Sequence, residues 1–157
     1  MRSSDPLPFQ CLTKYSKLCQ RVKFVDVDYM ELMTKKREII EQTDSLRQLL
    51  TNFSVFASGE TITIRSDHYM AVGCDLRDVE TLQRALTEEF DLETCMVLCT
   101  AEVSVTYMDV HAADALIRWA STIKDGNSSI DDLRRVHALI TARSSVLSSR
   151  AIFTRWT

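Results

Sequence analysis

"ETCMVLCTAEVSVTYMDVH" (residues 93–111) places two cysteines, an apolar run and a histidine in one short segment. The segment is rich in Val, Thr and Tyr, and from Ala101 onward apolar and polar residues alternate, which is typical of a half-buried β-strand. On a strand, the Cα atoms of Cys95 and Cys99 would lie about 13 Å apart. That separation is too large for a disulfide or a shared zinc ion. The pattern therefore predicts a strand whose thiols are interior residues rather than metal ligands.

Other segments have the periodicity of regular structure, and together they predict a mixed α+β domain. We expect an antiparallel sheet of three to five strands packed by amphipathic helices, with residues 1–27 as a basic N-terminal arm and 28–157 as the single domain. The expected elements are a long N-terminal helix over about 28–53, strands over 60–66 and 68–76, helices capped by Asp75 and Asp109, and a basic C-terminal helix or tail over about 129–157.

The long helix over about 28–53 predicts self-association. Four apolar residues on it recur every seven positions, which resembles one side of a coiled-coil seam. They are Leu32, Ile39, Leu46 and Phe53. The second seam position is weak, because lysine, glutamine or threonine occupies it in either register. We therefore expect an amphipathic helix that pairs with another copy and gives a homodimer or a higher homo-oligomer.

Charge is distributed unevenly along the chain and suggests an alternative function. Residues 1–24 and 133–157 are basic, although the formal net charge is −3 and the pI is about 5.6. Arginines and an aromatic residue near the C-terminus are candidates for contact with a partner or with RNA or DNA. These are Arg134, Arg135, Arg143, Arg150, Arg155 and Trp156. The competing explanation is that the basic ends dock on the acidic middle of the same or a neighbouring chain.

No motif in the sequence identifies a catalytic centre. Glycine is scarce, and neither a G-x-G-x-x-G fingerprint nor a P-loop is present. His68, His111 and His137 lie in no nucleophile signature, and a site assembled from distant residues is the remaining route to an enzyme. We therefore predict no catalytic residue, no metal ion and no cofactor. The favoured function is a non-enzymatic protein-interaction or assembly module whose partner the sequence does not identify.

Cysteine content and hydropathy bear on the compartment. The chain has five cysteines and no apolar run long enough to resemble a signal peptide or a membrane span. An odd number of cysteines without a secretion signal is typical of reduced thiols. We expect a cytoplasmic or nuclear protein that does not insert into a membrane.

Overall fold

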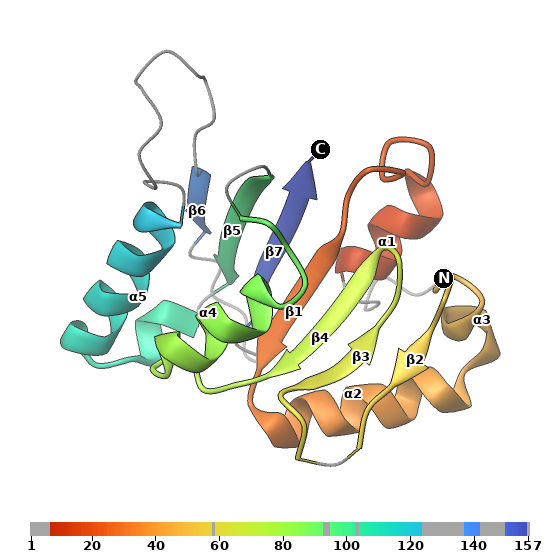
Figure 1. Cartoon of the computed structure of the whole chain (residues 1–157), viewed down its shortest axis with the longest axis horizontal. Helices are drawn as coiled ribbons and strands as arrows, with labels where there is room; N and C mark the ends of the chain where they lie inside the picture. The colour runs from red at the N-terminus through yellow and green to blue at the C-terminus, as the bar shows by residue number, and fades with distance from the viewer. Residues whose placement is uncertain are drawn as a thin grey trace.

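A computed structural model describes residues 7–57, 59–92, 95–102, 104–123, 137–141 and 150–156. Helices and strands alternate through much of this chain (Figure 1). In order they are α1 (Leu7–Lys14), β1 (Phe24–Asp28), α2 (Met30–Gln42), α3 (Asp44–Arg47), β2 (Ser54–Val55), β3 (Ile62–Arg65), β4 (Tyr69–Gly73), α4 (Val79–Thr87), β5 (Met96–Glu102), the 3-10 turn η1 (Ser104–Tyr107), α5 (Val110–Thr122), β6 (His137–Thr141) and β7 (Arg150–Trp156).

The strands form one seven-stranded mixed sheet with the order β2-β3-β4-β1-β7-β5-β6. β1 pairs with β4 in parallel, and β5 pairs with β6 in parallel. β7 runs antiparallel to both β1 and β5 and joins the two halves of the sheet. It follows that β1, β4, β5 and β6 all point in the same direction.

The predicted combination of helices and strands is confirmed, but the predicted antiparallel sheet of three to five strands is wrong. Both parallel pairs have helices in their connections: α2 and α3 lie between β1 and β4, and α5 lies between β5 and β6. A helix that crosses over between two strands brings the chain back to the same end of the sheet, so the next strand starts in the same direction.

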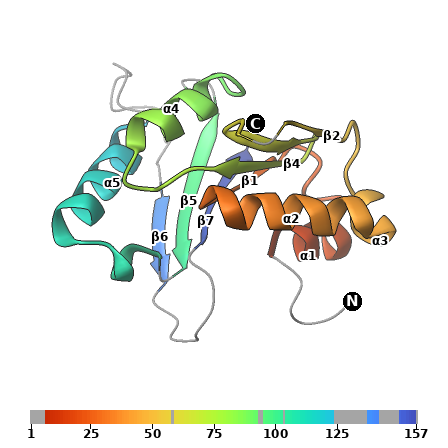
Figure 2. The ribbon, with the colours of Figure 1, turned by 90° about the horizontal axis from the view of Figure 1, so that it is seen from below.

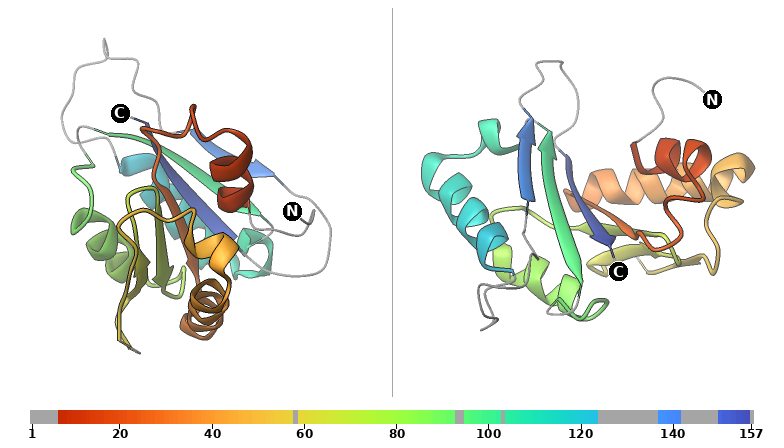
Figure 3. Two further views of the ribbon diagram at one scale, coloured as in Figure 1. Left: turned by 90° about the vertical axis from the view of Figure 1, so that its right-hand side faces the viewer. Right: turned by 90° about the horizontal axis from the view of Figure 1, so that it is seen from above.

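Helices cover both faces of the sheet (Figure 2). Alternate side chains of β1 and β4 enter separate cores. Val25 and Val27 pack with Leu82, Leu86 and other residues on the side of α4 and α5. Phe24 lies in the opposite core, which includes residues of α1 and α2. All five residues of β1 are buried, which is typical of a strand covered on both faces. The two further views in Figure 3 show the same layers.

The predicted long N-terminal helix over about 28–53 is not observed. Asp28 ends β1 instead of starting a helix, and the helical segment is divided into α2 and the short α3. Thr43 separates them because its backbone is extended, with φ −112° and ψ 96°. Residues 7–14 and 24–27 of the predicted arm contribute α1 and most of β1 to the fold.

The C-terminal region also differs from the expected helix. β6 and β7 occupy 137–141 and 150–156, within the helix or tail predicted over about 129–157, while 124–136 and 142–149 lie outside the described residues. Pairing with β5 explains the extended backbone, because β5 lies between β6 and β7 and hydrogen-bonds to both.

The central cysteine segment is extended as predicted, but for a shorter distance. β5 covers Met96–Glu102, and a 3-10 turn over Ser104–Tyr107 replaces the alternating end of the expected strand. Asp109 caps α5 as predicted, and its side chain accepts a hydrogen bond from Ala112 N at 3.0 Å. Asp75 does not cap α4: Asp78 does, by accepting from Thr81 N at 3.1 Å.

None of the described helices combines the length and the hydropathy needed to span a bilayer.

Gly73, at the end of β4, permits close packing of α2 against the sheet. A Cβ atom at this position would lie 2.7 Å from Met30 Sδ and Cε and 3.0 Å from Met30 Cα. We expect Gly73→Ala to lower the free energy of unfolding by about 1–3 kcal/mol, because the backbone of α2 must move away. Urea denaturation measures the change. Adding Met30→Ala should recover part of the loss, whereas equal stability of Gly73→Ala and the unmodified protein would contradict the close packing.

Candidate active site at the carboxyl edge of the sheet

The carboxyl ends of the parallel strands meet at one edge, which we call the carboxyl edge. β1 ends at Asp28, β4 is followed directly by Cys74, and the turn after β5 carries Tyr107. A backbone hydrogen bond of 2.8 Å from Cys74 N to Asp28 O joins the first two segments. A cavity of about 100 Å³ lies between them. In open α/β sheets, ligands bind outside the carboxyl ends of the strands, so this cavity is the candidate active site.

Asp28 supplies a carboxylate at the floor of the cavity. It is 5% exposed, and its Oδ1 accepts a hydrogen bond of 2.9 Å from Tyr29 N. This bond holds the carboxylate at the point where β1 passes into α2. A buried carboxylate at the end of a parallel strand is suited to accept hydrogen bonds from ligand hydroxyl groups.

Asp75 and Arg77 form a second polar group on the wall. Arg77 Nε lies 3.0 Å from both carboxylate oxygens of Asp75, and Arg77 N donates to Asp75 Oδ1 at 2.9 Å. The hydrogen bond from the Arg77 side chain lowers the pKa of Asp75, which keeps this carboxylate ionised at neutral pH.

Negative charge dominates the lining of the cavity. Asp28, Asp75 and Asp109 face a single cation, Arg77, among the lining residues. The pKa of Asp109 is lowered because its carboxylate accepts the backbone N–H of Ala112. This balance favours a cationic or hydroxyl-bearing ligand over a phosphate.

Two tyrosines lie at the same cavity and retain exposed surface. Tyr107, in the turn after β5, is 77% exposed, and Tyr29 also belongs to the exposed residues. A large exposed aromatic side chain at a polar cavity is a ready surface for stacking against a planar ligand.

Cys74 lines the cavity as a protonated thiol. Burial, followed by the charges of Asp78 and Asp75, raises the pKa of Cys74 to about 11. Because the thiolate is the reactive form, the neutral thiol is a poor nucleophile near pH 7.

We therefore expect native Cys74 to resist iodoacetamide at pH 8 and to react only as the pH approaches 11, where the thiolate becomes populated. Peptide mass spectrometry after a timed reaction measures the labelled fraction of each cysteine. Protein unfolded in urea provides the control, since all its thiols are accessible. Labelling of native Cys74 at pH 8 as rapid as in urea would contradict the raised pKa.

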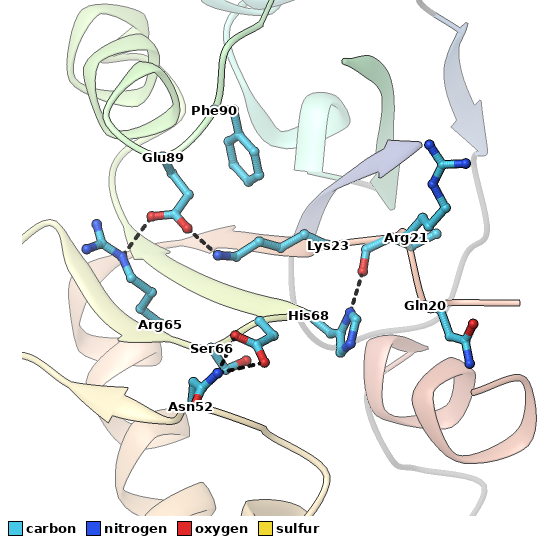
Figure 4. A pocket seen from close by; sticks show the side chains of 11 residues that line it. Gln20, Arg21, Lys23, Asn52, Arg65, Ser66, His68, Glu89 and Phe90 are labelled. Carbon is cyan, nitrogen blue, oxygen red and sulfur yellow. Dashed lines mark hydrogen bonds and ion pairs between the residues drawn. The ribbon is translucent and has the colours of Figure 1, made fainter. Parts of the chain in front are cut away.

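A larger cavity, of about 500 Å³, lies at the opposite edge of the sheet, which we call the amino edge (Figure 4). It is bordered by the residues before β1, by the β3–β4 turn and by the end of α4. Glu89 lies between two cations there: it pairs with Lys23, and Arg65 Nε is 2.8 Å from its Oε2. Despite its volume, this cavity is at the amino ends of β1 and β4, where α/β folds do not ordinarily place the reacting groups.

The residues predicted to mediate self-association do not lie together on one face. Leu32 and Ile39 are exposed on α2, whereas Leu46 and Phe53 pack against the buried core beneath it. Self-association through these four residues stays a prediction.

The predicted nucleic-acid contacts are described only in part. Arg134, Arg135 and Arg143 lie outside the described residues. Arg150, Arg155 and Trp156 belong to β7, whose backbone pairs with β1 and β5.

Among the described residues, no group of three or more His, Cys, Asp or Glu side chains is placed to hold a metal ion.

Comparison with known proteins supplies the family. The model of the family described as leucine carboxyl methyltransferase matches residues 7–121. The chain belongs to the leucine carboxyl methyltransferase family. The match includes β1, β4, β5 and most of α5, and it contains every residue that lines the carboxyl-edge cavity.

Three curated relatives of this leucine carboxyl methyltransferase family member are named tRNA wybutosine-synthesizing protein 4. The protein from Gibberella zeae is 49% identical over 122 residues, covering 76% of this chain and 12% of the relative. The one from Aspergillus fumigatus is 42% identical over 121 residues, covering 77% and 12%. The one from Eremothecium gossypii is 39% identical over 128 residues, covering 78% and 18%. The chain thus spans less than a fifth of the length of these relatives.

Membership of a methyltransferase family overturns the functional prediction made from the sequence. The predicted non-enzymatic assembly module is wrong, and so is the prediction that the chain does not belong to an enzyme. The cavity residues were not predicted from the sequence, because its pattern indicates a helix start at Asp28 and a helix cap at Asp75. The alternation of Val25 and Val27 with Asp26 and Asp28 is the signal that could have revealed a strand ending at a carboxylate.

Proposed function

We propose that this chain forms part of a methyltransferase that modifies tRNA, with the carboxyl-edge cavity holding part of the methyl donor. The single observation that carries the proposal is the coincidence of the family match with an acidic cavity at the ends of β1 and β4. The tRNA substrate is suggested by the name of the relatives. A substrate of this kind supports the predicted cytoplasmic or nuclear location, which stays a prediction.

The donor that fits these residues is a nucleoside with a cationic sulfur, such as S-adenosylmethionine. When bound, S-adenosylmethionine supplies a methyl group on a positively charged sulfur. Asp28 would accept hydrogen bonds from the ribose hydroxyls, and the excess of carboxylates would attract the cation. A volume of about 100 Å³ is below the roughly 300–1,000 Å³ of a complete ligand pocket, so the cavity accommodates only a portion of the donor.

Chemistry at the acceptor follows from the family description, which specifies a carboxyl group. A carboxylic acid with an ordinary pKa of about 4 is already ionised at neutral pH, so its oxygen needs no general base to accept a methyl group. Cys74 stays protonated and therefore does not compete for the methyl group.

Two measurements test the proposal. Isothermal titration calorimetry with S-adenosylhomocysteine should show one site per chain. Tritiated S-adenosylmethionine should then transfer label to bulk tRNA from cells, with a peptide ending in leucine as the alternative acceptor. Absence of S-adenosylhomocysteine binding would contradict the assignment of the cavity. Transfer to the peptide but not to tRNA would contradict the assignment of the substrate.

A further inference from the structure

We propose that the amino edge of the sheet is a docking surface for the sugar-phosphate backbone of the RNA, remote from the methyl-transfer site. The choice of RNA as the polymer rests on the proposed function. The docking surface consists of Arg21, Lys23 and Arg65, which line the larger cavity, and of the exposed Lys14 and Lys17 in the segment that leads to it.

The segment after α1 supplies the exposed part of the docking surface. Residues 13–21 are exposed except for Cys19, and they contain Lys14, Lys17 and Arg21 with no acidic residue. Tyr15 and Leu18 are also exposed, Leu18 by 73%. Cations interleaved with an exposed aromatic ring are the combination that binds phosphates and stacks on unpaired bases.

This segment is anchored to the sheet and not merely adjacent to it. Cys19 and Val22 are buried in the core beneath it. Phe24 N donates to His68 O at 2.9 Å, and His68 Nδ1 lies 3.1 Å from Val22 O. The cations before β1 are therefore held beside the β3–β4 turn, which lowers the entropy lost when they bind a ligand.

The cavity adds further cations, which acidic neighbours only partly neutralise. Glu89 is one carboxylate shared between Lys23 and Arg65, so this group retains a positive charge. Figure 4 shows both cations directed toward Glu89. Asp67 is held by the Asn52 side-chain amide at 2.9 and 3.0 Å. The docking surface and cavity thus combine five cations with two carboxylates.

The two edges of the sheet differ in charge, and this separates their ligands. The carboxyl edge is acidic and would repel phosphates, whereas the amino edge is basic. β1 connects the edges, and its five residues span about 17 Å, a distance that a few nucleotides can bridge. Pairing of Phe24 with Thr154 also brings the backbone of Arg155 to the amino edge.

The test is a triple charge reversal, Lys14→Glu, Lys17→Glu and Arg21→Glu, in the full chain. Fluorescence anisotropy with a labelled tRNA transcript measures affinity between 50 and 300 mM salt. We expect at least about a tenfold loss of affinity, and a decrease of about 2–3 in the slope of log affinity against log salt, because each lost phosphate contact removes just under one unit. The matched control reverses three exposed cations elsewhere: Lys35→Glu, Arg47→Glu and Arg118→Glu.

Equal losses in the two triple variants, or no binding of tRNA by the unmodified chain, would overturn the proposal. Equal competition by poly-glutamate at the same charge concentration would also overturn it, since the surface would then bind acidic polypeptides. S-adenosylhomocysteine titration separates this proposal from the proposed function. Loss of tRNA binding in the first triple variant, in a protein that never binds S-adenosylhomocysteine, would support the docking surface and contradict the methyl-donor site.

Discussion

Replacing Asp28 with asparagine is expected to weaken binding of S-adenosylhomocysteine by about 10- to 100-fold. Asparagine keeps the size of the side chain and an oxygen that can accept from Tyr29 N, so the turn into α2 should survive. The substitution removes the charge that would strengthen hydrogen bonds from the ribose hydroxyls. Hydrogen bonds to charged groups contribute about 1.5–3 kcal/mol, which corresponds to this change in affinity.

Isothermal titration calorimetry measures the effect of Asp28→Asn, and Asp114→Asn on the exposed face of α5 is the matched control. The control should leave affinity unchanged because Asp114 is not among the cavity residues. Circular dichroism of both variants shows whether the fold is retained. Undiminished affinity in folded Asp28→Asn protein would mean that the donor does not contact this carboxylate.

Replacing Lys36 with methionine is expected to lower the free energy of unfolding by about 3–5 kcal/mol, because it leaves the carboxylate of Asp26 buried without its cation. Asp26 lies in the middle of β1, and its Oδ2 accepts from both Lys36 Nζ and Tyr69 OH, the latter at 3.0 Å. The side chains of Lys36 and Asp26 are only 11% and 1% exposed. Asp26 Oδ1 has no hydrogen-bond partner among the described residues. The second oxygen of the carboxylate therefore offers no existing hydrogen bond to compensate for the loss of the lysine.

The control for Lys36→Met is Arg118→Met, which breaks an exposed ion pair with Asp114 on α5. Exposed pairs contribute about 0–1 kcal/mol, so this variant should unfold at nearly the same urea concentration as the unmodified protein. Adding Asp26→Asn to Lys36→Met should recover part of the lost stability, since it removes the buried charge. Similar costs for the two single variants would show that the Asp26–Lys36 pair is not a major contributor to stability.

Periodicity predicted the elements that have one buried face. Leu82, Leu86 and Phe90 form a buried stripe, and Asp109 caps its helix as expected. The prediction failed where tertiary pairing determines the conformation. β1 is buried on both faces with two aspartates in it, and β6 is extended beside β5 although its sequence has helical periodicity. Local patterns carry no information on such partners.

The candidate site could not be predicted for the same reason. Asp28, Cys74 and Tyr107 are far apart in the sequence, and they meet only because β1, β4 and β5 run in the same direction. Placing residues 24–27 in the basic arm and Asp28 at a helix start removed the first of these strands, so the convergence of the three segments could not be predicted. The basic residues near the N-terminus were evident from the sequence, but their position beside Arg65 and the β3–β4 turn depends on the pairing of β1 with β4.

The place of β7 in the sheet has a consequence for biosynthesis. It is the latest strand in the described chain, yet it fills the gap between β1 and β5. Until it leaves the ribosome, the nascent polypeptide exposes two unpaired strand edges that invite aggregation. Pairing between strands that are far apart in the sequence slows folding. A chaperone that shields these edges during translation would therefore benefit this protein more than it would benefit a protein built from local hairpins.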